Sequence, residues 1–226
     1  MVLGLSGKIL VLVIIIVFLS SFVAIVSLVV KIDSNPPTIA IKTPTKEAEY
    51  VTNTGFITIS GSAYDDIGLG GIGWTNKATD ENGNCSGSSD LSSWASTSIV
   101  LIEGKNLIDL KAWDRSGNIK HANITIYLDT VAPNCTIKMP TRSSTYSTHA
   151  DNISLVGGAS DNRGIESVEW INSANSASGT ALLGLTKLTW SAQAIDLRIG
   201  ENVITVTVKD AAGNYGEDHI TVTRLA

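Results

Sequence analysis

The sequence predicts a mainly β protein in which a long hydrophobic α-helix at the N-terminus precedes two β-sandwiches in tandem. Three observations support this prediction. The chain is uncharged from Ile9 to Val30, short segments after this run alternate between apolar and polar residues, and the later part of the chain is repeated at a constant offset of 96 residues. We therefore expect a helix over residues 1–33, one sandwich over 34–130 and a second over 131–226.

The uncharged run is long enough to cross a bilayer as a helix. At 1.5 Å per residue it would span about 33 Å, and Lys8 and Lys31 bound it on its two sides. A cleaved secretory signal fits less well, because the run is longer than a usual signal core and no small-x-small cleavage site follows it. The run predicts either a membrane anchor or an assembly helix that leaves the membrane to pack against its copies.

An assembly helix would bury an apolar face in the core of a filament. Small residues on its later turns, Ser20, Ser21, Ala24 and Ser27, would let neighbouring helices approach closely. The large residues expected to drive assembly are Ile9, Val13, Ile16, Phe18, Phe22, Val26 and Val30.

The charge balance is acidic, with 16 Lys and Arg residues against 21 Asp and Glu and a net charge of −5. No basic run occurs, so the composition argues against nucleic-acid binding, which needs clustered Lys and Arg. The two cysteines, Cys85 and Cys135, fall in different predicted sandwiches. In an exported chain they allow one disulfide between the sandwiches, and the alternative is two free thiols that act as small hydrophobic residues.

The repeat covers nearly the whole region after the apolar run, and a fixed offset between so many matched residues indicates a tandem duplication. The matched segments are Pro37–Thr45 with Pro133–Thr141, Gly61–Asp65 with Gly157–Asp161, and Asp114–Asn118 with Asp210–Asn214; the matched single residues include Trp74 with Trp170, Trp94 with Trp190, and Asn106 with Asn202.

Each copy has the pattern of β-strands. Val203–Val208 alternates with a period of two, and Asp210–Asn214 separates two alternating runs as a hairpin turn does. We expect Trp74 and Trp170 to fill the two sandwich centres, with carbohydrate stacking as the alternative role. The other expected core residues of the first copy, each with a partner 96 residues later, are Ile39, Ile41, Ile57, Ile59, Ile72, Leu107 and Leu110.

Residues 36–226 resemble bacterial and archaeal immunoglobulin-like surface repeats. The resemblance rests on the Pro-Pro-Thr-Ile start, the Ile-Ser-Gly and Ala-Tyr-Asp segments and the Asp-Arg-Ser-Gly-Asn hairpin. It implies two immunoglobulin-like domains of the kind that occur in adhesins, filament subunits and spacers of exported enzymes, where they display, space and bind.

No catalytic motif is present, so we expect no enzyme activity. The three histidines are scattered and none has metal-ligand spacing with another His or Cys. Asp65 and Asp161 lie in the turn before the Trp strand, while Asp114 and Asp210 lie in the last hairpin. These loops belong to the same end of such a sandwich, so the four residues are candidates for calcium binding; the alternative is that turns simply favour Asp. No other cofactor is expected.

Four Asn-x-Ser/Thr sequons occur in the chain. In an exported protein they predict N-linked glycans. The acceptor residues are Asn84, Asn123, Asn134 and Asn152.

The first ten residues, Met1–Leu10, resemble the mature start of archaeal type IV pilins and archaellins. The similarity lies in Gly4-Leu5 followed by the apolar run, and the acid found near the start of bacterial pilin helices is absent. The resemblance implies that Met1 is a processed end and that the helix rests in the cytoplasmic membrane before assembly. It also implies that copies of the chain then form an extracellular helical homopolymer.

The sequence therefore predicts a structural subunit of a pilus-like or archaellum-like filament that displays two immunoglobulin-like domains for adhesion. The first alternative is a single-span surface adhesin or binding module. A further alternative, an accessory subunit of a carbohydrate-active enzyme, would require exposed tryptophans.

Overall fold

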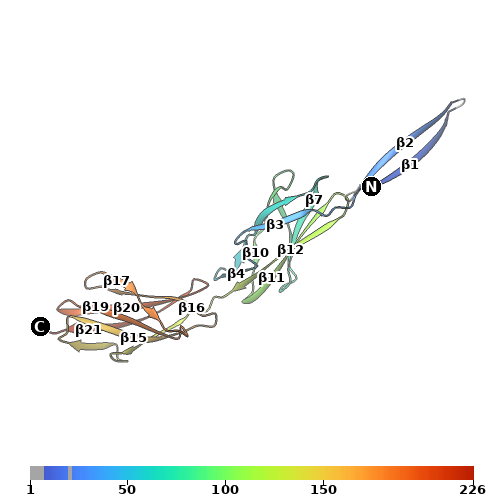
Figure 1. Ribbon diagram of the computed structural model, residues 1–226. Coiled ribbons are helices and arrows are strands. Elements are labelled where there is room, and N and C mark those ends of the chain that lie inside the picture. The colour runs from blue at the N-terminus through green and yellow to red at the C-terminus, as the bar shows by residue number, and fades with distance from the viewer. Residues whose placement is uncertain (1–7, 20–21) are drawn as a thin grey trace, which may run out of the picture. The chain divides into compact units, whose positions relative to one another are not determined.

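The computed structural model describes residues 8–19 and 22–226, and side chains from Asp33 onward; this part of the chain contains strands and no helix. Strands β1 (Lys8–Leu19) and β2 (Phe22–Asp33) form an antiparallel hairpin in which Leu19 pairs with Phe22 (Figure 1). The predicted N-terminal helix over residues 1–33 is therefore wrong for the described part of that segment. The expected processed end at Met1 lies outside the described residues.

The composition of the apolar run explains this correction. Val and Ile dominate it, and their β-branched side chains favour strands over helices, so hydropathy alone did not decide the secondary structure. Ser20 and Ser21 lie outside the described residues. In the part of the chain that is described, no helix has the length and apolar character needed to cross a membrane. The residues expected to form the assembly face lie instead on β1 and β2: Ile9, Val13, Ile16, Phe18, Phe22, Val26 and Val30.

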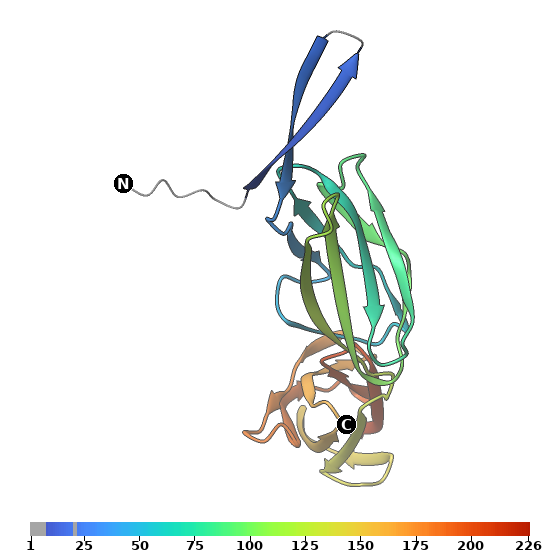
Figure 2. The same cartoon turned by 90° about the vertical axis from the view of Figure 1, so that its right-hand side faces the viewer.

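The chain divides into two compact units. The first contains the hairpin, the chain from there to Tyr50 and Phe56–Ile126, and the second contains Val51–Gly55 and Tyr127–Ala226. In the first unit, the strand order in the main sheet is β3-β6-β9-β8-β7-β11-β12-β4, and β10 and β5 form a short separate pair. The strands of this unit are coloured from blue to yellow-green in Figure 2. The strands are β3 (Thr38–Thr43), β4 (Glu49–Thr52), β5 (Phe56–Ile57), β6 (Ser60–Tyr64), β7 (Leu69–Asn76), β8 (Asn82–Gly87), β9 (Ser93–Ser96), β10 (Ile99–Val100), β11 (Gly104–Asp114) and β12 (Ile119–Leu128).

The second unit is a sandwich of two separate sheets, with strand orders β13-β15-β19-β18 and β14-β21-β20-β16-β17. One edge is built the same way in both units. In the first unit β8 pairs with both β7 and β9 and so joins the two layers; in the second, β17 and β18 are separated only by Ala181 and pair with β16 and β19, one in each layer. The strands are β13 (Asn134–Met139), β14 (Thr145–Thr148), β15 (Asn152–Ser160), β16 (Ile165–Asn172), β17 (Ala177–Thr180), β18 (Leu182–Leu183), β19 (Thr189–Asp196), β20 (Gly200–Asp210) and β21 (Tyr215–Arg224).

Each core lies between the layers, and most of the expected core residues are in it. Ile59, Ile72, Trp74 and Leu110 are buried in the first unit, while Ile39, Ile41 and Ile57 are partly buried. In the second unit Cys135, Ile137, Ile153, Leu155, Val168 and Val206 are buried.

Three expectations about the cores were wrong. Leu107 is only partly buried and Val203 is exposed, because the inward positions are the neighbouring Ile108 and Ile204. A shift of one residue on a strand moves the side chain to the opposite face. Trp170 packs against the core but is only partly buried.

The indole rings at the two sandwich centres belong to Trp94 and Trp190, which are almost wholly buried. Trp190 Nε1 donates a hydrogen bond of 3.1 Å to the carbonyl oxygen of Gly158. Its ring lies against Gly157, where a Cβ would overlap both the ring and the carbonyl oxygen of Thr136. The strands of this layer can therefore enclose the ring only because position 157 has no side chain.

Replacing Gly157 with Ala should lower the stability of the chain by about 3 kcal/mol, because the added methyl overpacks the core. The midpoint of urea unfolding measures the effect. Gly55→Ala is the matched control, since a Cβ there meets nothing within 4 Å. Equal midpoints for the two variants would contradict this account of the Trp190 pocket.

A buried asparagine fixes one turn of each unit. Asn202 is wholly buried, and its Oδ1 accepts hydrogen bonds from Arg198 N (2.9 Å) and Asn172 Nδ2 (3.0 Å). Its Nδ2 donates to the carbonyl oxygens of Arg198 (2.8 Å) and Gly200 (3.0 Å). Asn106 makes the equivalent bonds in the first unit. One side chain thus satisfies several buried polar groups of the turn before β20.

The variant Asn202→Ala should lose about 2–4 kcal/mol of unfolding free energy, since it leaves buried donors and acceptors without partners. Chemical denaturation checks this value. The exposed Asn152, whose amide contacts only the carboxylate of Asp151, provides the control variant Asn152→Ala. A loss at position 202 no larger than that of the control would refute the assignment.

Candidate functional site

Three carboxylates converge at one end of the second unit. Asp129 follows the end of β12, Asp161 follows β15, and Asp210 is the last residue of β20. Each offers one carboxylate oxygen, and these oxygens all lie within 4.8 Å of one another. The fold therefore brings together acids from three separate segments of the chain.

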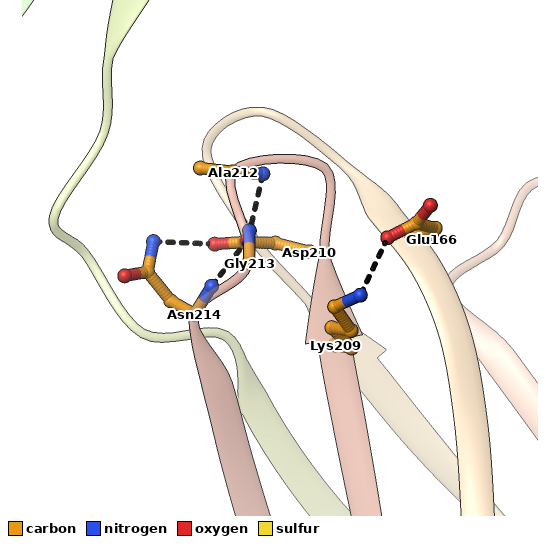
Figure 3. A network of polar contacts seen from close by, with 6 residues as sticks. All are labelled: Glu166, Lys209, Asp210, Ala212, Gly213 and Asn214. Carbon is orange, nitrogen blue, oxygen red and sulfur yellow. Dashed lines mark hydrogen bonds and ion pairs between the residues drawn. The ribbon is translucent and has the colours of Figure 1, made fainter. Parts of the chain in front are cut away.

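The hairpin after β20 fixes Asp210 (Figure 3). Asp210 Oδ1 accepts hydrogen bonds from the backbone N–H groups of Ala212 (2.8 Å), Gly213 (2.7 Å) and Asn214 (2.8 Å). Gly213 has a φ of 96°, which favours glycine at this position of the turn. Asn214 Nδ2 donates both to Asp210 Oδ2 (2.8 Å) and to the carbonyl oxygen of Asp129 (2.8 Å). The same side chain thus holds the hairpin and the segment entering the unit.

The carboxylates of Asp129 and Asp161 have fewer partners. Asp129 Oδ1 accepts hydrogen bonds from Val131 N and Asn162 Nδ2, each at 3.2 Å, and Asp161 Oδ1 accepts one from Arg163 N at 2.7 Å. The Oδ2 atoms of Asp129 and Asp161 are both buried without a hydrogen-bond partner. Asp129 as a whole is 0% exposed, so bulk solvent does not reach this carboxylate.

Nearby cations do not neutralise this cluster. In the described part of the chain, no Lys or Arg forms an ion pair with Asp129, Asp161 or Asp210. Lys209 Nζ pairs with Glu166 Oε2 at 3.4 Å (Figure 3), and the Arg163 guanidinium lies over the Tyr127 ring, 3.9 Å from its centroid. At about 4.8 Å each pair of like charges repels by about 3 kcal/mol at an effective dielectric constant near 20.

The first unit has a related cluster of Asp33, Asp65 and Asp66, whose carboxylate oxygens also lie within 4.8 Å of one another. Asp33 is buried and its Oδ2 has no partner, while Asp65 Oδ1 accepts hydrogen bonds from the turn after it. Asn118 Nδ2 donates to the carbonyl oxygen of Asp33 at 3.0 Å, as Asn214 does to that of Asp129.

Asp114 occupies the hairpin position of the first unit that Asp210 occupies in the second. Burial works to raise the pKa of its carboxyl, but hydrogen bonds from Asn118, Ser116 and Gly117 outweigh burial and hold the pKa below its ordinary value. Asp114 is therefore a charged residue fixed by its own turn.

The structure brings together two of the predicted calcium candidates, Asp161 and Asp210, in one cluster, and places Asp65 in the other. Asp114 is not among the three carboxylates of its cluster. The sequence analysis missed Asp33 and Asp129. They also lie 96 residues apart, each four residues before a matched proline, so extending the repeat to its entering segment would have found them.

The other predicted site residues lie apart from these clusters. The glycan acceptors Asn84, Asn123, Asn134 and Asn152 are all exposed. Cys85 on β8 and Cys135 on β13 are free thiols in different units. Burial raises the pKa of Cys85 to about 11 and that of Cys135 to about 12, so both thiols are uncharged at neutral pH.

Several solved structures of tandem domains are similar to this chain. The fibronectin(III)-like modules of CbhA from Clostridium thermocellum match with a TM-score of 0.51 at 14% identity, over 83% of this chain and 94% of that chain. A tetra-tandem repeat from the extending region of a large adhesion protein matches at 23% identity with a TM-score of 0.35, over 83% of this chain and 48% of that chain. Tandem Ig domains of titin match at 12% identity with a TM-score of 0.34, over 84% of this chain and 96% of that chain.

The likeness to the CbhA modules shows the fold: the expected tandem of immunoglobulin-like sandwiches is confirmed as a tandem of Ig/FnIII-like domains. No protein-family model and no curated protein sequence matches the chain.

Proposed function

We propose that this chain is a non-catalytic surface protein whose two Ig/FnIII-like sandwiches are displayed outside the cell for adhesion or binding. The segment Ile9–Val30 retains the chain at the cell surface through its apolar side chains. The observation that carries the proposal is a tandem of complete sandwiches after an uncharged run of this length.

The two separate cores support the proposal. Each unit encloses its own buried indole and aliphatic side chains, so each is a complete domain that can be displayed. All four sequon asparagines are exposed, as glycan attachment outside the cell requires.

We expect the full chain, expressed in cells with a C-terminal tag, to fractionate with membranes and to react with a membrane-impermeant amine reagent. Lys77 and Lys209, with side chains 50% and 51% exposed, provide reactive amines in the two units. The double variant Val17→Asp/Val26→Asp should be released into the medium, because two buried charges make the retention of the segment unfavourable.

The matched control for this experiment is Val17→Ala/Val26→Ala, which keeps the segment uncharged and should remain with the membranes. Protein that stays unlabelled inside intact cells would contradict the proposed surface location. Release of the control variant would contradict retention through the apolar segment.

A second candidate function is assembly into a filament, which the resemblance of Met1–Leu10 to archaeal pilins and archaellins implies. The uncharged segment favours it, because copies of the chain could cover that segment as well as a membrane does. Negative-stain microscopy of material sheared from the same cells separates the two candidates. Filaments of uniform diameter, absent from the Val17→Asp/Val26→Asp variant, would favour assembly over display of single chains.

A further inference from the structure

We propose that the two aspartate clusters are calcium sites, one in each unit. The inference does not depend on the proposed function. The ligands are Asp129, Asp161 and Asp210 in the second unit and Asp33, Asp65 and Asp66 in the first.

The first argument is the missing partner of Asp129. Its carboxylate is wholly buried, and its Oδ2 accepts no hydrogen bond. The buried Oδ2 of Asp161 is in the same situation, and both residues contribute a carboxylate oxygen to the group within 4.8 Å. A buried anionic oxygen without a donor is unfavourable, and a neighbouring carboxylate makes it more so. One cation held by these carboxylates balances their charge and removes the repulsion.

The second argument is the chemistry of the donors. Both clusters consist of carboxylates, with no His or Cys in either, and oxygen-only sites select hard cations. The acids come from turns and strand ends, a setting that suits the irregular geometry of calcium better than the strict octahedron of magnesium. Water and backbone carbonyls would complete the six to eight ligands that calcium takes.

The third argument is that both units assemble three carboxylates, although the third one comes from different positions in the two copies. Asp33 corresponds to Asp129 and Asp65 to Asp161 at the offset of 96. The third acid of the second unit comes from the hairpin, at Asp210, because the turn holds Asn162 where the first unit has Asp66. Each unit thus collects three carboxylates, one of which belongs to a buried acid of its entering segment whose Oδ2 has no partner.

The position of the site indicates what the ion would do. Asp129 lies in the short segment between Leu128, the end of β12, and Asn134, the start of β13. Asp161 and Asp210 lie in the turns after β15 and β20. Calcium would therefore connect the entering segment to two loops of the second unit and stabilise the folded state against unfolding.

The test uses the full chain after removal of metals with EDTA. Titration calorimetry with CaCl2 should give two sites, and Asp129→Asn and Asp33→Asn should each lose one, with affinity there reduced at least about 10-fold. Asn keeps the shape and an acceptor oxygen but removes the charge. Asp151→Asn, which changes an exposed acid outside both clusters, is the matched control and should keep both sites.

Thermal unfolding separates a metal site from a merely structural cluster. Calcium at 100 times its Kd should raise the Tm of the parent chain by about 5 °C and that of Asp129→Asn by less. In EDTA, Asp129→Asn should be at least as stable as the parent chain, because the variant removes one of the carboxylates that repel one another. Absence of binding up to 5 mM CaCl2, or an Asp129→Asn variant that is less stable in EDTA, would overturn the proposal. Equal affinity for MgCl2 would overturn the assignment to calcium.

Discussion

In each sandwich, one side-chain amide joins the last hairpin to the segment that enters the unit. Asn214 Nδ2 contacts both the carboxylate of Asp210 and the carbonyl oxygen of Asp129, and Asn118 does the same with Asp114 and Asp33. In both units the bond to the entering segment joins residues 85 positions apart. The carboxylate that orients the amide is itself held by backbone N–H groups of the hairpin, so the amide has a fixed direction. The position of the first strand, and of the acid just before it, follows from this contact.

The duplication made most of the fold predictable from the sequence. A period of two defines the strands, and two copies of each pattern distinguish a real strand from a chance alternation. The same period does not identify the inward face where two consecutive residues are both apolar, as in Leu107-Ile108. There, Ile108 faces inward because it lies on the same face of the strand as the buried Asn106, two positions earlier. The apolar run shows the opposite limit. Its hydropathy is compatible with helix or strand, and only its β-branched composition favours the hairpin that the structure contains.

The sequence predicted the turn aspartates of the candidate site but not the aspartates of its entering segments. Turn aspartates at matched positions indicated Asp65, Asp161 and Asp210, because the loops of a sandwich meet at its ends. Asp33 and Asp129 could not be recognised by turn chemistry, since they lie in entering segments and act through burial. Burial and the absence of a hydrogen-bond donor depend on tertiary packing, and no local sequence pattern encodes them. The distinction between Asp114 and Asp210 also depends on packing, because both hairpins have nearly the same sequence.

Both units close one edge of the sandwich with a segment that passes from one layer to the other. In the first unit β8 pairs with β7 through residues 82–84 and with β9 through residues 85–87. In the second unit β17 pairs with β16, Ala181 N donates a hydrogen bond of 2.8 Å to the carbonyl oxygen of Val168, and β18 pairs with β19. A force that pulls the layers apart at this edge must therefore break backbone hydrogen bonds in both units. The two copies share this mechanical reinforcement although their sequences differ along the segment.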